Sequence, residues 1–372
     1  MALKYLLPGQ MHFMQQNGFE VIMISADGKE REEVIENEGC RHVIVPMTRQ
    51  ITPLQDLKCL MNLIRIFKKE KPDIVHTHTP KAGLLGMLAA KICGVKIRIH
   101  TVAGLPLMAE KGFKYRLLKY IEKITYAAAN HVWPNSYSLK KFISQQQLAH
   151  ADKLLVIAQG STNGINLNRF NKQVLVDAVI MQVKSSINFS ERNIYLLCIG
   201  RLVYDKGIVE LVKAFIQVQK KNPHLKLVLV GDYEELLDPL PGDILNEIEN
   251  NSGIIHIRWT NYVEYYMALA QLFIFPSHRE GFPNVLLQAG AMELPILCST
   301  IPGNIDIVIH KQTGLLFEKG NIEQIIEHIE YAMGNADKMK KMSYNLYLTV
   351  NEKYQREKIW ENILEKYRSL LN

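Results

Sequence analysis

The sequence predicts a doubly wound α/β fold built in two similar halves. Short apolar strands alternate with amphipathic helices along almost the whole chain, which is the order found in parallel sheets covered by helices. The 372 residues exceed the length that one hydrophobic core usually serves. A polar stretch without strong periodicity interrupts the alternation at 171–192. We therefore expect an N-terminal domain over 1–170, a linker over 171–192 and a C-terminal domain over 193–351.

The first half is expected to begin with a helix. "ALKYLLPGQMHFMQQ" has helical spacing, Gly18 makes a turn, and "FEVIMIS" follows as a strand. Because a parallel sheet of this class normally starts with a strand, we expect the N-terminal domain to lack its first strand and Met1 to be an internal methionine of a longer gene product. Further strands are expected in "CRHVIVP", "DIVHTH", "IRIHTV", "HVWPNS" and "KLLVIAQG", with helices at 54–70, 81–92 and 112–129.

The second half repeats the alternation. Strands are expected in "NIYLLCIG", "LKLVLVG", "IIHIRW", "LFIFPS", "LPILCS" and "TGLLF", with helices near 206–220, 262–270, 283–292 and 321–333. A last helix over 352–372 carries Trp360 and Tyr367 on an apolar stripe, and we expect it to cross back to the N-terminal domain. Ligands of such folds bind at the carboxyl ends of the strands, here in a cleft between two domains.

Composition and charge restrict the class of protein. Hydrophobic residues make up 48% and charged residues 22%, as in soluble globular proteins. The formal charge of +7 fits a phosphate-rich ligand, an anionic membrane surface or nucleic acid, and does not choose among them. The five cysteines are far apart and form no CxxC pair, so neither a zinc site nor a disulfide framework is indicated. We expect neither a membrane-spanning segment nor a signal peptide.

Three loops of the second half carry residues suited to a phosphorylated ligand, although each alone also fits an ordinary turn or helix cap. "GRLVYDKG" places Arg201 and Lys206 at a helix start, where backbone N–H groups and the helix dipole also favour a diphosphate. Gly231 ends a buried strand and would let the backbone approach a ligand closely. Glu280 stands at another helix start, and Gln288 follows about two turns later on roughly the same face. The residues that open this helix, suited to sugar hydroxyls or phosphate, are Gly281, Phe282, Pro283 and Asn284.

Several motifs together resemble one enzyme family. "GRLVYDKG" and "PSHREGFPNVLLQAGAMELPIL", with "HTHTPKAGLLGMLAA", "RIHTVAGLP" and "NGINLNRF", strongly resemble the retaining nucleotide-sugar transferases of glycosyltransferase family 4. The resemblance covers almost the whole chain, with the motifs in the expected order. It implies the GT-B fold, which consists of two Rossmann-like domains. Within the family, the chain is similar to bacterial enzymes that build capsule, O-antigen or other surface glycans on lipid carriers.

The resemblance gives the motif residues their expected roles. Arg201 and Lys206 would hold the donor diphosphate, and Glu280 would contact the transferred sugar as the first acid of the family's Glu-x7-Glu motif. The second acid, which binds the ribose in relatives, is replaced by Gln288, whose amide lacks the charge of a carboxylate. Glu293 stands where relatives usually carry glycine. A left-handed backbone at that position would cost glutamate about 1 kcal/mol.

The first half contributes further candidates. His100 matches the family's active-site histidine near the donor sugar, and Lys81 and Gly83 could meet acceptor phosphate. We expect His76 and His78 to face different sides of their strand and so not to share a metal; the resemblance implies neither a metal nor a cofactor. The helix at 112–129 carries an apolar stripe flanked by basic residues. It could lie on an anionic bilayer or pack its stripe on the sheet.

The sequence therefore predicts a retaining glycosyltransferase that is cytoplasmic and peripherally attached to the inner face of the plasma membrane. Its partners would be a nucleoside-diphosphate sugar, UDP-linked, and a glycan on polyprenyl diphosphate, with no role for nucleic acid. Two alternatives stay open: a sugar-nucleotide epimerase of the same fold, and a degenerate binding protein, which Gln288, Glu293 and the missing strand favour. A nicotinamide dehydrogenase is disfavoured, because no GxGxxG follows any strand.

Overall fold

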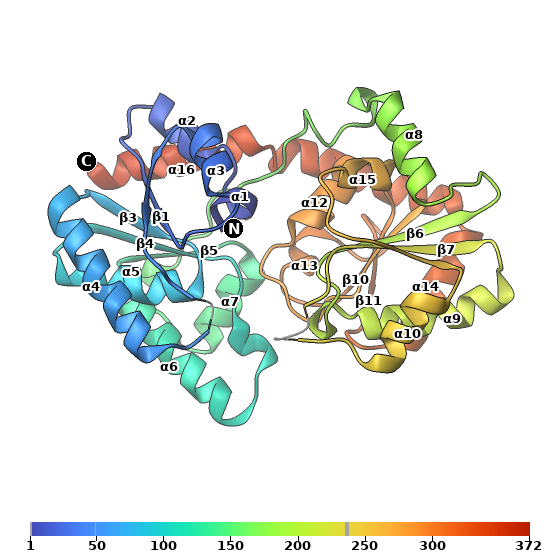
Figure 1. Ribbon diagram of the computed structural model, residues 1–372, viewed down its shortest axis with the longest axis horizontal. Helices are drawn as coiled ribbons and strands as arrows, with labels where there is room; N and C mark the ends of the chain where they lie inside the picture. Colours follow the sequence, from blue (N-terminus) through green and yellow to red (C-terminus); the bar gives the residue numbers. More distant parts are fainter. Residues whose placement is uncertain (1, 49, 235–237) are drawn as a thin grey trace. The chain divides into compact units, whose positions relative to one another are not determined.

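The computed structural model describes residues 2–48, 50–234 and 238–372, and the chain divides into two compact units (Figure 1). Unit 1 comprises Met1–Gly164 and Arg356–Asn372, and unit 2 comprises Ile165–Gln355. Each unit has parallel strands with helices packed against them. None of the described helices is both long and apolar enough to cross a bilayer.

In the described part of unit 1, the strands form two separate parallel sheets. β1 (Ile22–Ser25) pairs with β2 (Arg41–Ile44), and a second sheet has the order β3 (Ile74–Thr77), β4 (Ile97–Val102) and β5 (His131–Pro134). The described residues before β1 form helices, as expected, and no strand. The segment 153–160, expected as a strand, contributes only a single bridge from Leu154 to Val132.

The helices of unit 1 cover its sheets from both sides. The predicted long helices are confirmed as α4 (Pro53–Glu70), α5 (Pro80–Ile92) and α6 (Gly112–Ala128). α16 (Arg356–Leu371) packs Ile359, Ile363 and Leu364 against β4, Trp133 and Met14. The remaining α-helices are α1 (Ala2–Leu6), α2 (Gln10–Gln16), α3 (Arg31–Glu38) and α7 (Tyr137–Gln145).

Unit 2 contains one parallel six-stranded sheet with the order β11-β10-β9-β6-β7-β8. Its strands are β6 (Ile194–Ile199), β7 (Leu225–Val230), β8 (Ile254–Ile257), β9 (Leu272–Phe275), β10 (Ile296–Ser299) and β11 (Leu315–Phe317). β7 and β8 lie on one side of β6, and β9 to β11 lie on the other. The order in which strands are added therefore reverses between the neighbouring strands β6 and β9. Doubly wound sheets bind ligands at this position.

Helices cover both faces of the unit 2 sheet. One face carries α9 (Ile208–Lys221), α10 (Gly242–Asn250) and α14 (Ile322–Gly334), with Phe215 and Ile329 fully buried beneath them. The other face carries α8 (Asp177–Ser186), α11 (Val263–Leu269), α12 (Asn284–Ala291) and α15 (Ala336–Lys353). A short α13 (Asn304–Ile307) follows β10.

The stretch predicted as a linker differs from the prediction. Residues 171–192 contain a 3-10 turn (Lys172–Val174) and α8, whose Val183 is buried in the core of unit 2 together with Ile187. Val179 and Ile180 pack against the same core. The spacing of these four residues is helical, but polar neighbours on the other faces conceal it.

Glu293 has a left-handed backbone conformation, with φ at 48°. This conformation fits the expectation drawn from relatives that usually carry glycine at this position. Glu293 follows the end of α12, where its N–H donates to Gly290 O at 3.1 Å and the N–H of Leu294 donates to Ala289 O at 2.9 Å. This is the usual helix ending in which glycine is preferred, because a Cβ crowds the next carbonyl.

We expect Glu293→Gly to raise the free energy of unfolding of unit 2 by about 1 kcal/mol, since glycine adopts this conformation without strain. Chemical denaturation measures the change. Glu247→Gly in α10 is the matched control and should lower stability by a similar amount, because glycine costs about 1 kcal/mol inside a helix. A Glu293→Gly protein that is no more stable than the original chain would contradict strain at this position.

Candidate active site

The loops that follow β6 and β9 meet at the carboxyl edge of the unit 2 sheet. The β6 loop runs through Gly200 and Arg201 into a 3-10 turn (Tyr204–Lys206) before α9, and the β9 loop carries Glu280 into α12. The backbone N–H of His278 donates to Asp205 O at 2.8 Å, and the Arg279 guanidinium donates to the Asp205 carboxylate at 2.6 Å. These contacts hold the two loops together.

Two glycines allow the loops to approach. A Cβ at Gly207 would overlap the carbonyl oxygen of Pro276, and one at Gly231 would overlap the carbonyl oxygen of Gly200. Both glycines also have positive φ, at 69° and 147°, a region that side chains disfavour. Gly231 therefore acts here by letting the β7 loop pass the β6 loop.

Lys206 and Glu280 form an ion pair between these loops. The Lys206 ammonium donates to Glu280 Oε1, and the Ser277 hydroxyl donates to the same oxygen at 2.7 Å. Only 21% of the Lys206 side chain and 14% of the Glu280 side chain is exposed. The Lys206 ammonium also lies 5.5 Å from the centre of the Phe275 ring. A carboxylate and an ammonium are thus fixed side by side at the point where the strand order reverses.

Arg201, on the same loop as Lys206, is less tightly enclosed than Lys206. Its side chain is half exposed and pairs with Glu234 on the β7 loop. An exposed pair of this kind contributes little stability, so the guanidinium can exchange Glu234 for an incoming anion at small cost. Arg201 and Lys206 are therefore two cations that this edge offers to a ligand.

Some residues at the start of α12 are buried in the core, and others are partly exposed beside the candidate site. The Phe282 side chain is buried against Tyr354, with ring centres 5.4 Å apart, and Gly281 and Pro283 are buried as well. Phe282 can therefore meet a ligand only through its backbone. Asn284 and Gln288 are partly exposed, and the Gln288 carboxamide hydrogen-bonds to no other described residue.

Sequence analysis missed the charged residues that support these loops. Besides the Asp205–Arg279 pair, His278 Nε2 lies 3.1 Å from the Glu210 carboxylate in the first turn of α9. The Asp205–Arg279 pair joins the "DKG" segment to the "HRE" segment, and the His278–Glu210 contact joins the "HRE" segment to the start of α9. The opposite charges of Asp205 and Arg279 are visible in the two motifs, but their pairing depends on loops that lie far apart in sequence.

In unit 1, His100 lies at the carboxyl edge of β4. It is 2% exposed, its Nδ1 is 2.8 Å from the Thr77 hydroxyl, and its ring lies against Gly83 on α5. A small hollow beside it is lined by His78, His100, Thr101, Gly104 and Glu122, among others. Glu122 was not singled out from the sequence. Burial raises the pKa of its carboxyl to about 7.

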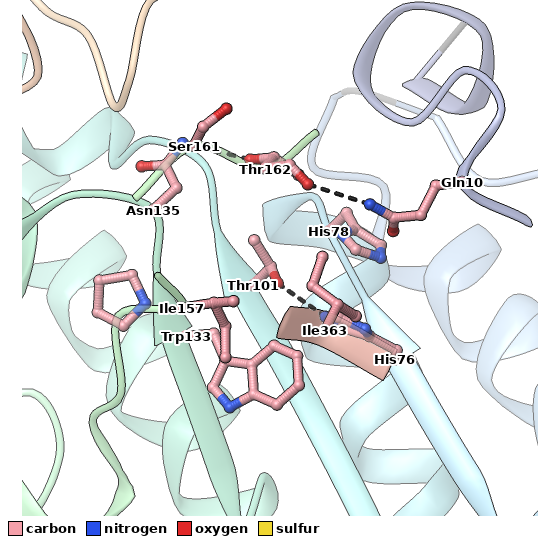
Figure 2. Close-up of a pocket in the computed structure, with 11 residues that line it drawn as sticks. Gln10, His76, His78, Thr101, Trp133, Asn135, Ile157, Ser161, Thr162 and Ile363 are labelled. Atoms are coloured by element: carbon pink, nitrogen blue, oxygen red, sulfur yellow. Dashed lines mark hydrogen bonds between the residues drawn. The ribbon is translucent and has the colours of Figure 1, made fainter. Parts of the chain in front are cut away.

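The prediction for His76 and His78 is wrong. Their ring centres are 4.1 Å apart, because residues two apart on a strand share a face. Both line a second small hollow, with Gln10, Thr101 and Asn135 (Figure 2). His76 Nε2 is 2.7 Å from the Thr101 hydroxyl and its Nδ1 is 2.5 Å from the Tyr367 hydroxyl, so both nitrogens are engaged. Within the described ranges, no three potential metal-ligating residues gather in one place.

Lys81 points to a different partner from the one expected. Its ammonium donates to Asp56 Oδ1 at 2.7 Å, to the Thr48 hydroxyl at 3.2 Å, and to the carbonyl oxygen of Gln50. These bonds attach the segment before α4 to the start of α5. Lys81 and Gly83 therefore have structural contacts here, to the 48–56 segment and to the His100 ring respectively.

Comparison with known proteins shows the family. Residues 181–349 match the family model described as "Glycosyl transferases group 1", and residues 4–155 match "Glycosyl transferase 4-like". The chain is 36% identical over 366 residues to the capsular polysaccharide biosynthesis glycosyltransferase CapM of Staphylococcus aureus, covering 98% of this chain and 94% of that one. The chain belongs to glycosyltransferase family 4 and is a glycosyltransferase.

Two further proteins extend the comparison. The chain is 26% identical to the Escherichia coli UDP-Gal:alpha-D-GlcNAc-diphosphoundecaprenol alpha-1,3-galactosyltransferase, over 85% of this chain and 81% of that one. The structure of Alr3699/HepE of Anabaena, in complex with UDP-glucose, superposes with a TM-score of 0.79 at 16% identity, over 96% of this chain and 94% of that one. The fold is GT-B, as expected.

Burial favours the neutral form of His78 and His100. Desolvation lowers the pKa of His100 from 6.5 to about 4. Desolvation, followed by repulsion from His100, lowers the pKa of His78 to about 3. The unfolded chain therefore takes up protons below pH 6.5 that the folded chain does not, and stability is lost as pH falls from 6.5 toward 4.

We expect His100 alone to lower the free energy of unfolding by about 1.4 kcal/mol per pH unit in that window. Denaturant titrations at several pH values, followed by fluorescence of Trp133, measure the slope, because Trp133 packs 5.1 Å from His76. His100→Asn should flatten the slope, whereas the exposed His224→Gln should leave it unchanged. Equal slopes in the original and His100→Asn proteins would show that His100 titrates normally.

Proposed function

We propose that the chain transfers a sugar from a UDP-linked donor to a glycan carried on polyprenyl diphosphate, with retention, at the inner face of the plasma membrane. The observation that carries the proposal is the Lys206–Glu280 pair at the strand-order reversal, with Arg201 in the adjoining loop. The names of two relatives support it: the S. aureus relative serves capsular polysaccharide synthesis, and the E. coli relative uses UDP-Gal and a diphosphoundecaprenol acceptor.

The charges in unit 2 match the developing charge of the reaction. As the bond from the sugar C1 to the diphosphate oxygen breaks, negative charge grows on the diphosphate. Lys206 and Arg201 would bind this charge more strongly in the transition state than in the ground state, which is how binding accelerates chemistry. The acceptor hydroxyl forms the new bond to C1 on the same face, and its proton passes to the leaving diphosphate.

Glu280 and His100 have different proposed roles toward the sugar. Glu280 would accept hydrogen bonds from the hydroxyls of the transferred sugar, since its Oε1 is already fixed by Lys206 and Ser277. His100, which burial keeps neutral, would hydrogen-bond a sugar hydroxyl without adding charge. The backbone N–H groups at positions 281, 282 and 284, around the start of α12, would bind sugar hydroxyls or phosphate, whereas the proline at 283 has no N–H to donate. Gln288 would contact the ribose hydroxyls.

We expect Arg201→Ala and Lys206→Ala each to lower turnover about 10- to 100-fold, since each removes a charge-assisted hydrogen bond to the diphosphate worth about 1.5–3 kcal/mol. Turnover is measured by the mass of the lipid-linked product. Lys213→Ala, on the exposed face of α9, is the matched control. Because Lys206→Ala also leaves Glu280 without its cation, its thermal unfolding is measured beside its turnover. Folded Arg201→Ala and Lys206→Ala proteins with unchanged rates would overturn the assignment.

We expect Gln288→Glu to tighten UDP binding by about 1 kcal/mol, because a carboxylate accepts stronger hydrogen bonds from hydroxyls than an amide does. Isothermal titration calorimetry measures the affinity. UDP lacking both ribose hydroxyls is the matched control ligand, and its affinity should not rise in the variant. Weaker or equal binding of UDP by Gln288→Glu would contradict the ribose contact.

A further inference from the structure

The first half of α6 turns apolar side chains toward solvent. Phe113 is 81% exposed, Tyr120 65% and Leu117 37%, and positions i, i+4 and i+7 lie on one helix face. The helix packs through other residues, with Glu122, Thr125, Tyr126 and Ala128 buried. The helix therefore packs on unit 1 through its second half and, in its first half, through Tyr115 and Leu118. Phe113 and Tyr120 stay mostly exposed, and Leu117 is partly covered.

α4 has the same property in its first half. Leu54 is 81% exposed, Leu57 57% and Met61 45%, while Cys59, Leu63 and Phe67 on the opposite face are buried. α4 and α6 thus each carry one apolar face that packs on unit 1 and a second apolar face that points to solvent. A surface helix of a soluble domain needs only the face that packs on the core.

Positive charge surrounds these outward faces. α6 and the residue before it carry Lys111, Lys114, Arg116, Lys119 and Lys123, and α4 carries Lys58, Arg65, Lys68 and Lys69. The acids nearby are occupied: Asp56 pairs with Lys81, Glu70 with Arg41, and Glu110 with Lys114, while Glu122 is buried. The surroundings of the apolar residues are therefore basic.

Both outward faces lie at the edge of unit 1 that carries His100. In a parallel sheet, the helix after a strand starts at that strand's carboxyl end, so α5, after β3, and α6, after β4, begin at the edge where β4 presents His100. α4 follows β2, which belongs to the other sheet of unit 1. α4 and α6 both pack against α5, and the three lie together in Figure 1. The Lys81 bonds to Thr48, Gln50 and Asp56 fix the start of α4 beside the start of α5.

We propose that these outward faces form a docking surface for an anionic lipid bilayer, made by Leu54, Leu57, Met61, Phe113, Leu117 and Tyr120. The apolar side chains would enter the boundary between headgroups and acyl chains, and the surrounding lysines and arginines would attract anionic headgroups. The inference rests on the proposed function in one respect, since a lipid-linked acceptor places the reaction at a membrane. The docking surface would hold the His100 edge close to that membrane.

The test uses the full chain and vesicles of two compositions, phosphatidylcholine alone and phosphatidylcholine mixed with phosphatidylglycerol. We expect binding by flotation to the mixed vesicles only, weakened by high salt, and reduced about tenfold or more in the Leu54→Ser/Phe113→Ser double variant. Both side chains are 81% exposed, so the fold is retained. Leu348→Ser, a 48% exposed leucine on α15 in unit 2, is the matched control.

Three results would overturn the docking surface. The first is equal binding to both kinds of vesicle, or binding to neither. The second is an equal loss of binding in Leu348→Ser. The third is a dimer in analytical ultracentrifugation that Leu54→Ser/Phe113→Ser dissociates while vesicle binding is unchanged, which would make this surface a contact between two copies of the chain.

Turnover separates this inference from the proposed function. On a short-chain, water-soluble diphosphate-linked acceptor, Leu54→Ser/Phe113→Ser should match the original chain, and on an acceptor embedded in mixed vesicles it should be slower. If vesicle binding responds as expected but no protein turns over either acceptor, the proposed function fails and the docking surface stands. If turnover is normal on both acceptors in both proteins, the docking surface has no role in reaching the acceptor and the inference fails.

Discussion

The ion pair between Lys206 and Glu280 is the interaction on which the candidate site depends. Removing either partner from a mostly buried pair leaves an uncompensated charge, which is far more costly than the pair itself is stabilising. The pair also forms only because Gly207 lets the start of α9 lie against Pro276, and because Asp205 holds the backbone of His278 and the side chain of Arg279. The backbone packing at the carboxyl edge of the sheet thus fixes the position of both charges before any ligand arrives.

The two units offer contrasting chemistry. In unit 2, Arg201 and Lys206 supply two cations, one half exposed and one largely buried. In unit 1, burial favours the neutral form of His76, His78, His100 and Glu122 alike, by lowering the pKa of the histidines and raising that of the carboxyl. Cations suit the diphosphate of a donor, whereas neutral hydrogen-bonding groups suit the hydroxyls of a sugar.

Much of the fold could be predicted from the sequence, because strand and helix periods are strong over buried parallel sheets. The bounds of α4, α5 and α6 belong to this group. The positive φ of Glu293 was suggested instead by the resemblance to relatives that usually carry glycine at this position. α8 was missed because Val179, Ile180 and Val183, which pack on the core, stand in a segment without a strong helical pattern. The contacts of Lys81 with the 48–56 segment were not foreseen, because they depend on a loop that is distant in sequence. The prediction that His76 and His78 face different sides was wrong, because residues two apart on a strand share a face.

Product stereochemistry tests the central claim most directly. The purified chain is incubated with UDP-sugars and a polyprenyl-diphosphate-linked glycan, and the product is analysed by mass spectrometry and by NMR of the new glycosidic linkage. The account predicts a lipid-linked product heavier by one sugar, with the anomeric configuration of the donor, and no change of the donor when the acceptor is omitted. An inverted linkage, an epimerised UDP-sugar formed without acceptor, or UDP-sugar binding with no product would contradict it.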